Sequence, residues 1–125
     1  MSVGLVLVTH PGIASALLQQ ARQIVGDELA GVETLEVYDR RNGAGRQLAE
    51  TLERVDGGAG VLILTDLPGA TPANLAVATC TEGCRVVSGV NLAMLIRVWN
   101  YRDRPIAELT ALAVDGGRKA IMEIN

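Results

Sequence analysis

Residues 60–72 read GVLILTDLPGATP, and this stretch decides the fold class. Its first half, Gly60–Thr65, is a short apolar run rich in branched side chains, which is typical of a strand buried on both faces. The loop Asp66–Ala70 follows, and Thr71-Pro72 then predicts a helix with Thr71 as its N-cap and proline at its first position. A buried strand that passes through a short loop into a helix is the unit of a parallel α/β sheet.

The same alternation extends over most of the chain. The predicted strands are Val3–Thr9, Val32–Tyr38, Gly60–Thr65 and Arg85–Val90. The predicted helices run over about Pro11–Gly26, from an Asn42 cap to Gly57-Gly58, from Thr71 past Thr79, over Leu92–Trp99, and from Pro105 to a break at Gly116-Gly117. The tail Ala120–Ile124 fits a helix or a short edge strand. We therefore predict one domain, 1–125, with an open, mainly parallel four-stranded α/β sheet in the order 2-1-3-4, helices on both faces and room for an extra C-terminal edge strand.

Composition excludes several classes of function. The 125 residues are 49% apolar and carry a net charge of −3, and no run of Lys or Arg stands out. This composition fits a compact domain and argues against a nucleic-acid surface. The apolar runs are too short to cross a bilayer, and no signal peptide is visible at the N-terminus. The expected location is the cytoplasm, with no insertion into a membrane.

The two cysteines, Cys80 and Cys84, lie four positions apart. This is not the two-residue gap of a redox motif or a zinc knuckle, and the chain has no second pair. We expect buried or idle thiols, as suits a reducing cytoplasm, and no metal site.

The chain has a single histidine, His10, directly after the first strand, while Asp66 directly follows the third. In the order 2-1-3-4 these strands are neighbours, so His10 and Asp66 are expected side by side at the switch point where ligands bind. A carboxylate that accepts the Nδ1 hydrogen would leave Nε2 free as a nucleophile. The adjacent helix starts, after His10 and at Thr71, suit a phosphate. A capping histidine and a turn aspartate remain the alternative for these residues.

Three segments carry a resemblance to a known family. They are Val6-Leu7-Val8-Thr9-His10, the run from Leu64 to Asn74 (LTDLPGATPAN), and the run from Ser88 to Leu95 (SGVNLAML). In this order and spacing they resemble the mannose-type EIIA domain of the bacterial phosphoenolpyruvate:sugar phosphotransferase system, and the similarity covers nearly the whole chain.

The resemblance implies a function and a set of partners. It implies that His10 is phosphorylated by the carrier protein HPr and passes the phosphoryl group to a IIB partner, with no cofactor. It implies that Asp66 hydrogen-bonds the active histidine and that Thr71, with Gly69 and Ala70, lies in the loop against the phosphoryl group. A homodimer that exchanges a C-terminal strand is also implied.

Two other functions remain open from the sequence. In the first, a signalling module uses the same His10, and its phosphorylation controls binding to a regulator instead of sugar uptake. In the second, a nucleotide-binding domain relies on Gly43-Ala44-Gly45 after a strand. Leu48 stands where the third glycine of the dinucleotide fingerprint belongs, which weakens this alternative.

Overall fold

A computed structural model describes residues 1–39 and 41–125, and within this part four strands form one fully parallel sheet. The strands are β1 (Gly4–Thr9), β2 (Glu33–Glu36), β3 (Val61–Thr65) and β4 (Cys84–Val87), in the order β2-β1-β3-β4. The helices are α1 (Ile13–Val25), α2 (Ala44–Val55), α3 (Thr71–Thr79), α4 (Leu92–Asn100) and α5 (Ile106–Lys119). The predicted α/β class, strand order and parallel pairing are confirmed.

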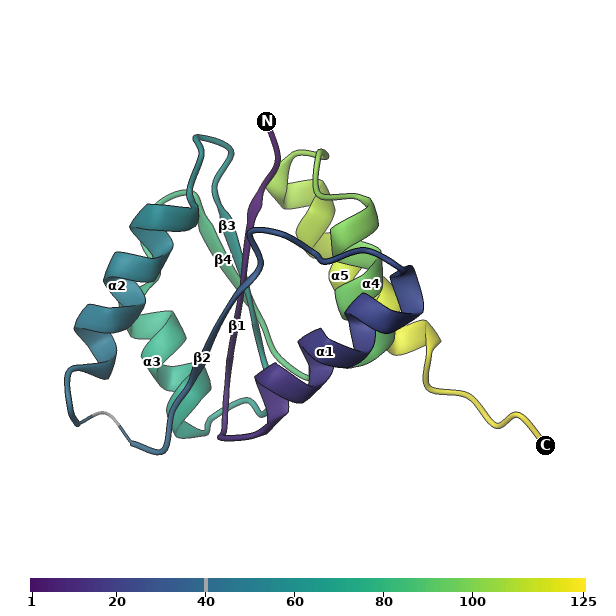
Figure 1. Cartoon of the computed structure of the whole chain (residues 1–125), viewed down its shortest axis with the longest axis horizontal. Helices are drawn as coiled ribbons and strands as arrows, with labels where there is room; N and C mark the ends of the chain where they lie inside the picture. Colours follow the sequence, from purple (N-terminus) through teal and green to yellow (C-terminus); the bar gives the residue numbers. More distant parts are fainter. Residues whose placement is uncertain (40) are drawn as a thin grey trace.

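Helices cover both faces of the sheet, with α2 and α3 on one side and α1, α4 and α5 on the other (Figure 1). Side chains alternate along each strand, so Leu5 and Leu7 of β1 pack toward α1, α4 and α5. Val6 and Val8 pack toward α2 and α3. Burial on both faces explains why β1 and β3 are apolar without interruption.

Two helices start differently from prediction. Asn42 does not cap α2; it has a left-handed backbone (φ 61°), and Gly43 takes the N-cap position with φ 76°. Thr71 is not the cap of α3 either, because the helix includes it and Ala70 stands at the N-cap without a side-chain hydrogen bond. Pro72 lies in the first turn, as predicted, where its missing N–H costs nothing.

The predicted break at Gly116-Gly117 is wrong, since α5 continues to Lys119. The two glycines are buried where α5 meets α4. A Cβ added at Gly116 would lie 2.8 Å from Cδ of Arg97, and one at Gly117 would lie 2.8 Å from Cε of Met94. The glycines therefore allow the two helices to approach closely.

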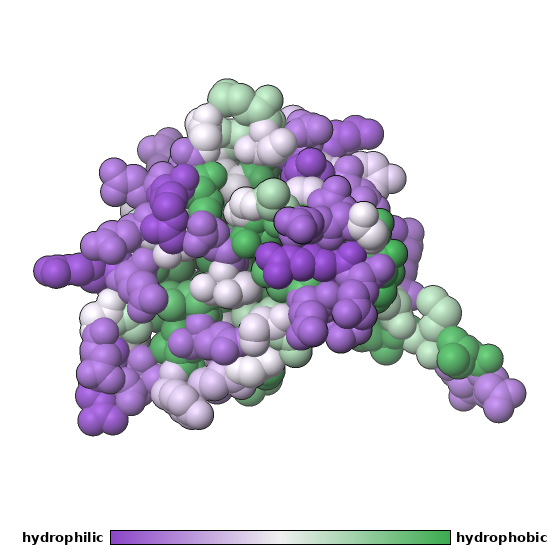
Figure 2. Space-filling model, viewed as in Figure 1, coloured by the Kyte–Doolittle hydropathy of each residue, from purple (hydrophilic) through white to green (hydrophobic). Residues whose placement is uncertain are grey.

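The C-terminal tail, residues 120–125, pairs with no strand in this chain. It leaves the body of the molecule after α5 (Figure 1) and carries apolar side chains into solvent (Figure 2). Ile121 and Ile124 are 81% and 88% exposed. The extra edge strand is thus absent from the single chain.

The expectation of idle thiols is also wrong, because Cys80 and Cys84 form a disulfide. Cys80 ends α3 and Cys84 begins β4. The turn between them, in which Cys84 N–H donates to the carbonyl of Thr81 at 3.0 Å, brings their Cα atoms to 5.5 Å. That separation is ordinary for a disulfide.

Candidate active site

The candidate site lies at the carboxyl ends of the two central strands. β1 and β3 are neighbours. After β1 the chain continues to β2 on one side of this pair, and after β3 it continues to β4 on the other side. His10 is the first residue after β1 and Asp66 the first after β3. Crevices of this kind, where the strand order reverses, are the usual ligand sites of parallel sheets.

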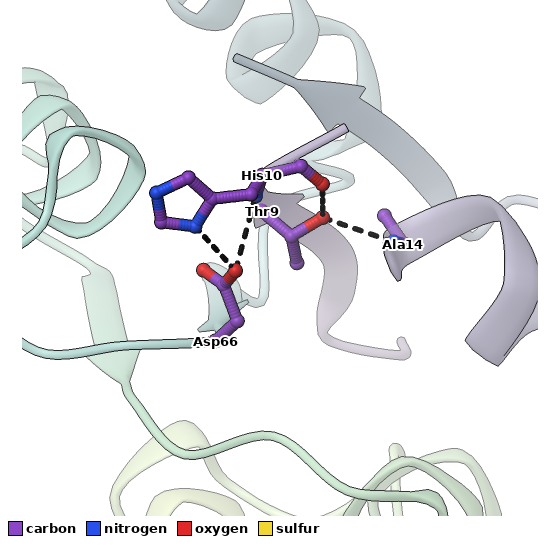
Figure 3. A network of polar contacts seen from close by, with 4 residues as sticks. All are labelled: Thr9, His10, Ala14 and Asp66. Atoms are coloured by element: carbon purple, nitrogen blue, oxygen red, sulfur yellow. Dashed lines mark hydrogen bonds and ion pairs between the residues drawn. The ribbon is translucent and has the colours of Figure 1, made fainter. Parts of the chain in front are cut away.

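The structure brings His10 and Asp66 into contact. Nδ1 of His10 lies 2.6 Å from Oδ2 of Asp66, and the backbone N–H of His10 donates to the same oxygen at 3.1 Å (Figure 3). The Asp66 side chain is 11% exposed, while that of His10 is 39% exposed. An ionised carboxylate only accepts, so Nδ1 carries the proton, and in the neutral imidazole Nε2 then has the lone pair. Nε2 points away from Asp66 (Figure 3).

The charge of Asp66 is set by two opposing effects. Burial raises the pKa of this carboxyl, but the hydrogen bonds from the His10 ring and from the His10 backbone hold the pKa below its ordinary value. Oδ1 of Asp66 is buried and has no hydrogen-bond partner among the described residues. Asp66 is therefore an anion at neutral pH that is directed at His10 through one oxygen.

Thr9 fixes the backbone beside His10. This side chain is fully buried, its hydroxyl donates to the His10 carbonyl at 2.8 Å, and it accepts the Ala14 N–H at 2.9 Å (Figure 3). The single hydroxyl thus joins the end of β1 to the first turn of α1. Thr9 is not among the site residues predicted from the sequence, although a buried threonine between a strand and a helix start is a recognisable signal.

The start of α1 is closed by protein groups. Oε2 of Glu36, at the end of β2, accepts the Ser15 N–H at 2.9 Å and the Ser15 hydroxyl at 2.8 Å. The hydrogen bonds from the Ser15 backbone and side chain lower the pKa of Glu36. The helix start beside His10 therefore offers fewer free N–H groups to a phosphate than the sequence predicts. Sequence reasoning missed Glu36 because its contact crosses from a separate strand.

The start of α3 is open by comparison. The first helical hydrogen bond runs from the Asn74 N–H to the Ala70 carbonyl at 2.9 Å, and no side chain caps the helix. The N–H groups of Thr71 and Ala73 therefore have no intrahelical acceptor. Among described residues, no hydrogen bond joins Thr71 to His10 or Asp66. The structure thus places Thr71 at the helix start without a direct link to the pair.

Gly69 and Ala70 form the last part of the loop before α3. Gly69 has φ 82°, a backbone that favours glycine, and a Cβ added there would meet nothing within 4 Å. Its carbonyl accepts the Asn74 side-chain amide at 3.1 Å. The space beside Gly69 is therefore open. This part of the loop leads directly into the N–H groups of α3, which no side chain caps.

Other kinds of site find no support in the described part of the chain. It holds no group of three or more His, Cys, Asp or Glu side chains that could bind a metal ion. None of its helices has the length and apolar character that crossing a membrane requires. Gly43 is the N-cap of α2, and Gly45 lies in the first turn of that helix. This helix follows the edge strand β2 in the chain.

Comparisons with known proteins give a consistent result. The family model described as PTS system fructose IIA component matches residues 4–112. A mannose/sorbose specific IIA subunit of the phosphotransferase system from Enterococcus faecalis is 32% identical, with a TM-score of 0.86, over 100% of this chain and 96% of that one. Phosphotransferase system component EIIA from Streptococcus agalactiae is 22% identical (TM-score 0.80; 97% and 96% covered).

A third solved structure shares the fold alone. It is a sigma-54 interaction domain protein from Enterococcus faecalis, 12% identical, with a TM-score of 0.76 over 96% of this chain and 93% of that one. A comparison with curated protein sequences gave no match.

Proposed function

Since the chain belongs to the family described as PTS system fructose IIA component, we propose that it is a phosphoryl carrier of a sugar phosphotransferase system. It accepts a phosphoryl group from phospho-HPr on His10 and passes it to a IIB partner in the cytoplasm. The observation that carries the proposal is the contact of Nδ1 with Asp66, which leaves Nε2 free and facing away.

The transfer is a direct displacement between two imidazoles. The Nε2 lone pair of His10 attacks the phosphorus, a new N–P bond forms, and the N–P bond to the histidine of HPr breaks. The leaving nitrogen keeps the electron pair of that bond. No metal or organic cofactor is required, because the donor already carries an activated phosphoryl group and catalysis rests on positioning and electrostatics.

Asp66 and the loop before α3 have separate roles in this scheme. As Nε2 bonds to phosphorus while Nδ1 keeps its proton, the His10 ring becomes positively charged, and the Asp66 anion 2.6 Å from Nδ1 stabilises that charge. The N–H groups at the start of α3, with Gly69, Ala70 and the Thr71 hydroxyl, hold the phosphoryl oxygens. The same interactions apply when the group moves on to the next protein.

The carrier is proposed to act as a homodimer that exchanges its C-terminal strand. β4 is an edge strand in the single chain. A groove runs beside it, lined by Val86, Val87 and Ser88 and, on the other side, by Ile121 at the start of the tail. In this dimer the exposed apolar tail of one copy pairs with the open edge of β4 in the other copy.

A regulatory role for the same phosphorylation remains the second candidate. The observation in its favour is that this fold also occurs in the sigma-54 interaction domain protein from Enterococcus faecalis. In this alternative, phosphorylated and unphosphorylated His10 would differ in their binding to a regulator, and a IIB protein would not discharge the phosphoryl group.

The test is reconstitution with enzyme I, HPr and phosphoenolpyruvate, followed by intact mass spectrometry. We expect one acid-labile phosphoryl group on the wild type and none on His10→Ala. Since the chain has a single tryptophan, Trp99, its fluorescence can verify that the variant is folded. A His10→Ala protein that is still phosphorylated would falsify the proposal. Adding IIB proteins of the mannose family then separates the candidates, because only the carrier is discharged by one of them.

A further inference from the structure

Glu36 supplies the cap that α1 lacks. It is the last residue of β2 and pairs with Thr9 in the parallel register of the two strands. The N-cap position of α1 is Gly12, which has φ 89° and no side chain to accept a hydrogen bond. The Glu36 carboxylate accepts hydrogen bonds from the N–H and the hydroxyl of Ser15, so a neighbouring strand caps the helix.

With Glu36 in place, three N–H groups at the start of α1 have acceptors within the protein. The N–H of Ile13 donates to the His10 carbonyl at 3.3 Å, and that of Ala14 donates to the Thr9 hydroxyl at 2.9 Å. That of Ser15 donates to Glu36 at 2.9 Å. A helix start attracts phosphate through free N–H groups and partial positive charge. Here both are taken up by an ionised carboxylate.

We propose that Glu36 is a positioning residue that closes the start of α1 to anions and so restricts the phosphoryl group on His10 to the α3 side of the site. The inference rests on the proposed phosphorylation of His10 and deepens it. A phosphoryl group held from one side is released to the next protein more readily than one held by two helix starts. Removal of Glu36 would expose the N–H group of Ser15 as a second anion position at the start of the helix that follows His10.

The first experiment uses the unphosphorylated protein and inorganic phosphate as the probe, with the backbone amide signals followed by NMR. In the wild type, the Ser15 signal should not respond to phosphate. In Glu36→Ala it should shift in a saturable way. Glu36→Gln keeps an acceptor oxygen but loses the charge, so its shift should be smaller than that of Glu36→Ala. A wild type that responds at the Ser15 amide, or a Glu36→Ala protein that does not, overturns the proposal.

The second experiment measures transfer from the phosphorylated protein back to unphosphorylated HPr. Glu36→Ala should transfer about two- to fivefold more slowly, the range of a charge at a helix start, with an unchanged KM for HPr. Glu36→Gln, which keeps an acceptor oxygen but loses the charge, should have a rate between those of Glu36→Ala and the wild type. The matched control is Glu33→Ala, which removes an acidic side chain of the same strand that pairs with Arg54 at 2.7 Å, away from α1.

The two experiments separate the possible failures. If Glu33→Ala slows the transfer as much as Glu36→Ala, the effect comes from the stability of β2 and the proposal is wrong. If HPr phosphorylates none of the proteins, the proposed function fails, while the phosphate titration still decides whether Glu36 closes α1.

Discussion

Oδ2 of Asp66 accepts two hydrogen bonds from one residue, from Nδ1 of the His10 ring at 2.6 Å and from the His10 backbone N–H at 3.1 Å. One oxygen therefore sets the ring tautomer and the position of the backbone from which the ring extends. A carboxylate that only balanced charge would not need the second contact. We therefore expect the reactivity of His10 to depend on Asp66.

Replacing Asp66 by asparagine should slow the phosphorylation of His10 by about 10- to 100-fold. The change keeps the size of the side chain but removes the negative charge, and a hydrogen bond to a charged group contributes about 1.5–3 kcal/mol. The rate of phosphorylation by phospho-HPr is the measurement. A variant within twofold of the wild type would show that the charge is not used.

The same substitution should change how stability depends on pH. The pKa of Asp66 is lowered in the folded protein, so this group stabilises the fold above the unfolded value of about 3.9, and the contribution is lost as the pH falls through the folded value. The difference in unfolding free energy between wild type and Asp66→Asn should therefore shrink below about pH 4. Urea unfolding followed by Trp99 fluorescence measures it, and a pH-independent difference contradicts the prediction.

Reducing the Cys80–Cys84 bond should lower the free energy of unfolding by about 2 kcal/mol, because the bond closes a short loop that constrains the unfolded chain only modestly. The measurement is thermal unfolding with and without a reductant. The double variant Cys80→Ser/Cys84→Ser is the control, and its melting temperature should not respond to the reductant. Equal melting temperatures for the oxidised and reduced wild type would argue against a stabilising bond.

Removal of the tail after Lys119 should convert the proposed dimer into a monomer. The tail is exposed in the single chain, and its apolar side chains have no partner surface within it. Light scattering coupled to gel filtration should give twice the 13.1 kDa chain mass for the wild type and a single mass for the truncated protein. A full-length chain that is monomeric at high concentration contradicts strand exchange.

Gly60→Ala should destabilise the protein by about 1–3 kcal/mol. Gly60 has φ 90°, and a Cβ there would collide with the backbone carbonyl of Gly83, which accepts the Val61 N–H at the start of β3. Gly57→Ala is the matched control, since that position is open and should change stability by less than about 0.5 kcal/mol. Similar losses for the two variants would show that the contact at Gly60 is not responsible.

The central sheet and the juxtaposition of His10 with Asp66 could be predicted because both follow from strong local signals. Two apolar runs of strand length demand burial on both faces, and the parallel order then places the residues after them at one edge. Nothing in this step depends on side-chain detail. Residue roles in catalysis stay predictions, since placement alone does not test them.

The missed features depend on contacts between distant segments. Glu36 caps α1 from a different strand, so no local pattern around Gly12 indicates it. Gly116 and Gly117 would end an isolated helix, yet here they allow α4 to approach α5. At Asn42, the left-handed backbone that asparagine tolerates moved the cap to the next residue.

The hydrogen bond at Nδ1 also determines which phosphohistidine isomer is to be sought. With Nδ1 occupied by Asp66, the proposed phosphorylation of His10 should give the tele isomer and not the pros isomer in the folded state. The two isomers differ in chemical lifetime and in their recognition by antibodies. An antibody specific for the tele form should therefore detect the phosphorylated protein, and one specific for the pros form should not.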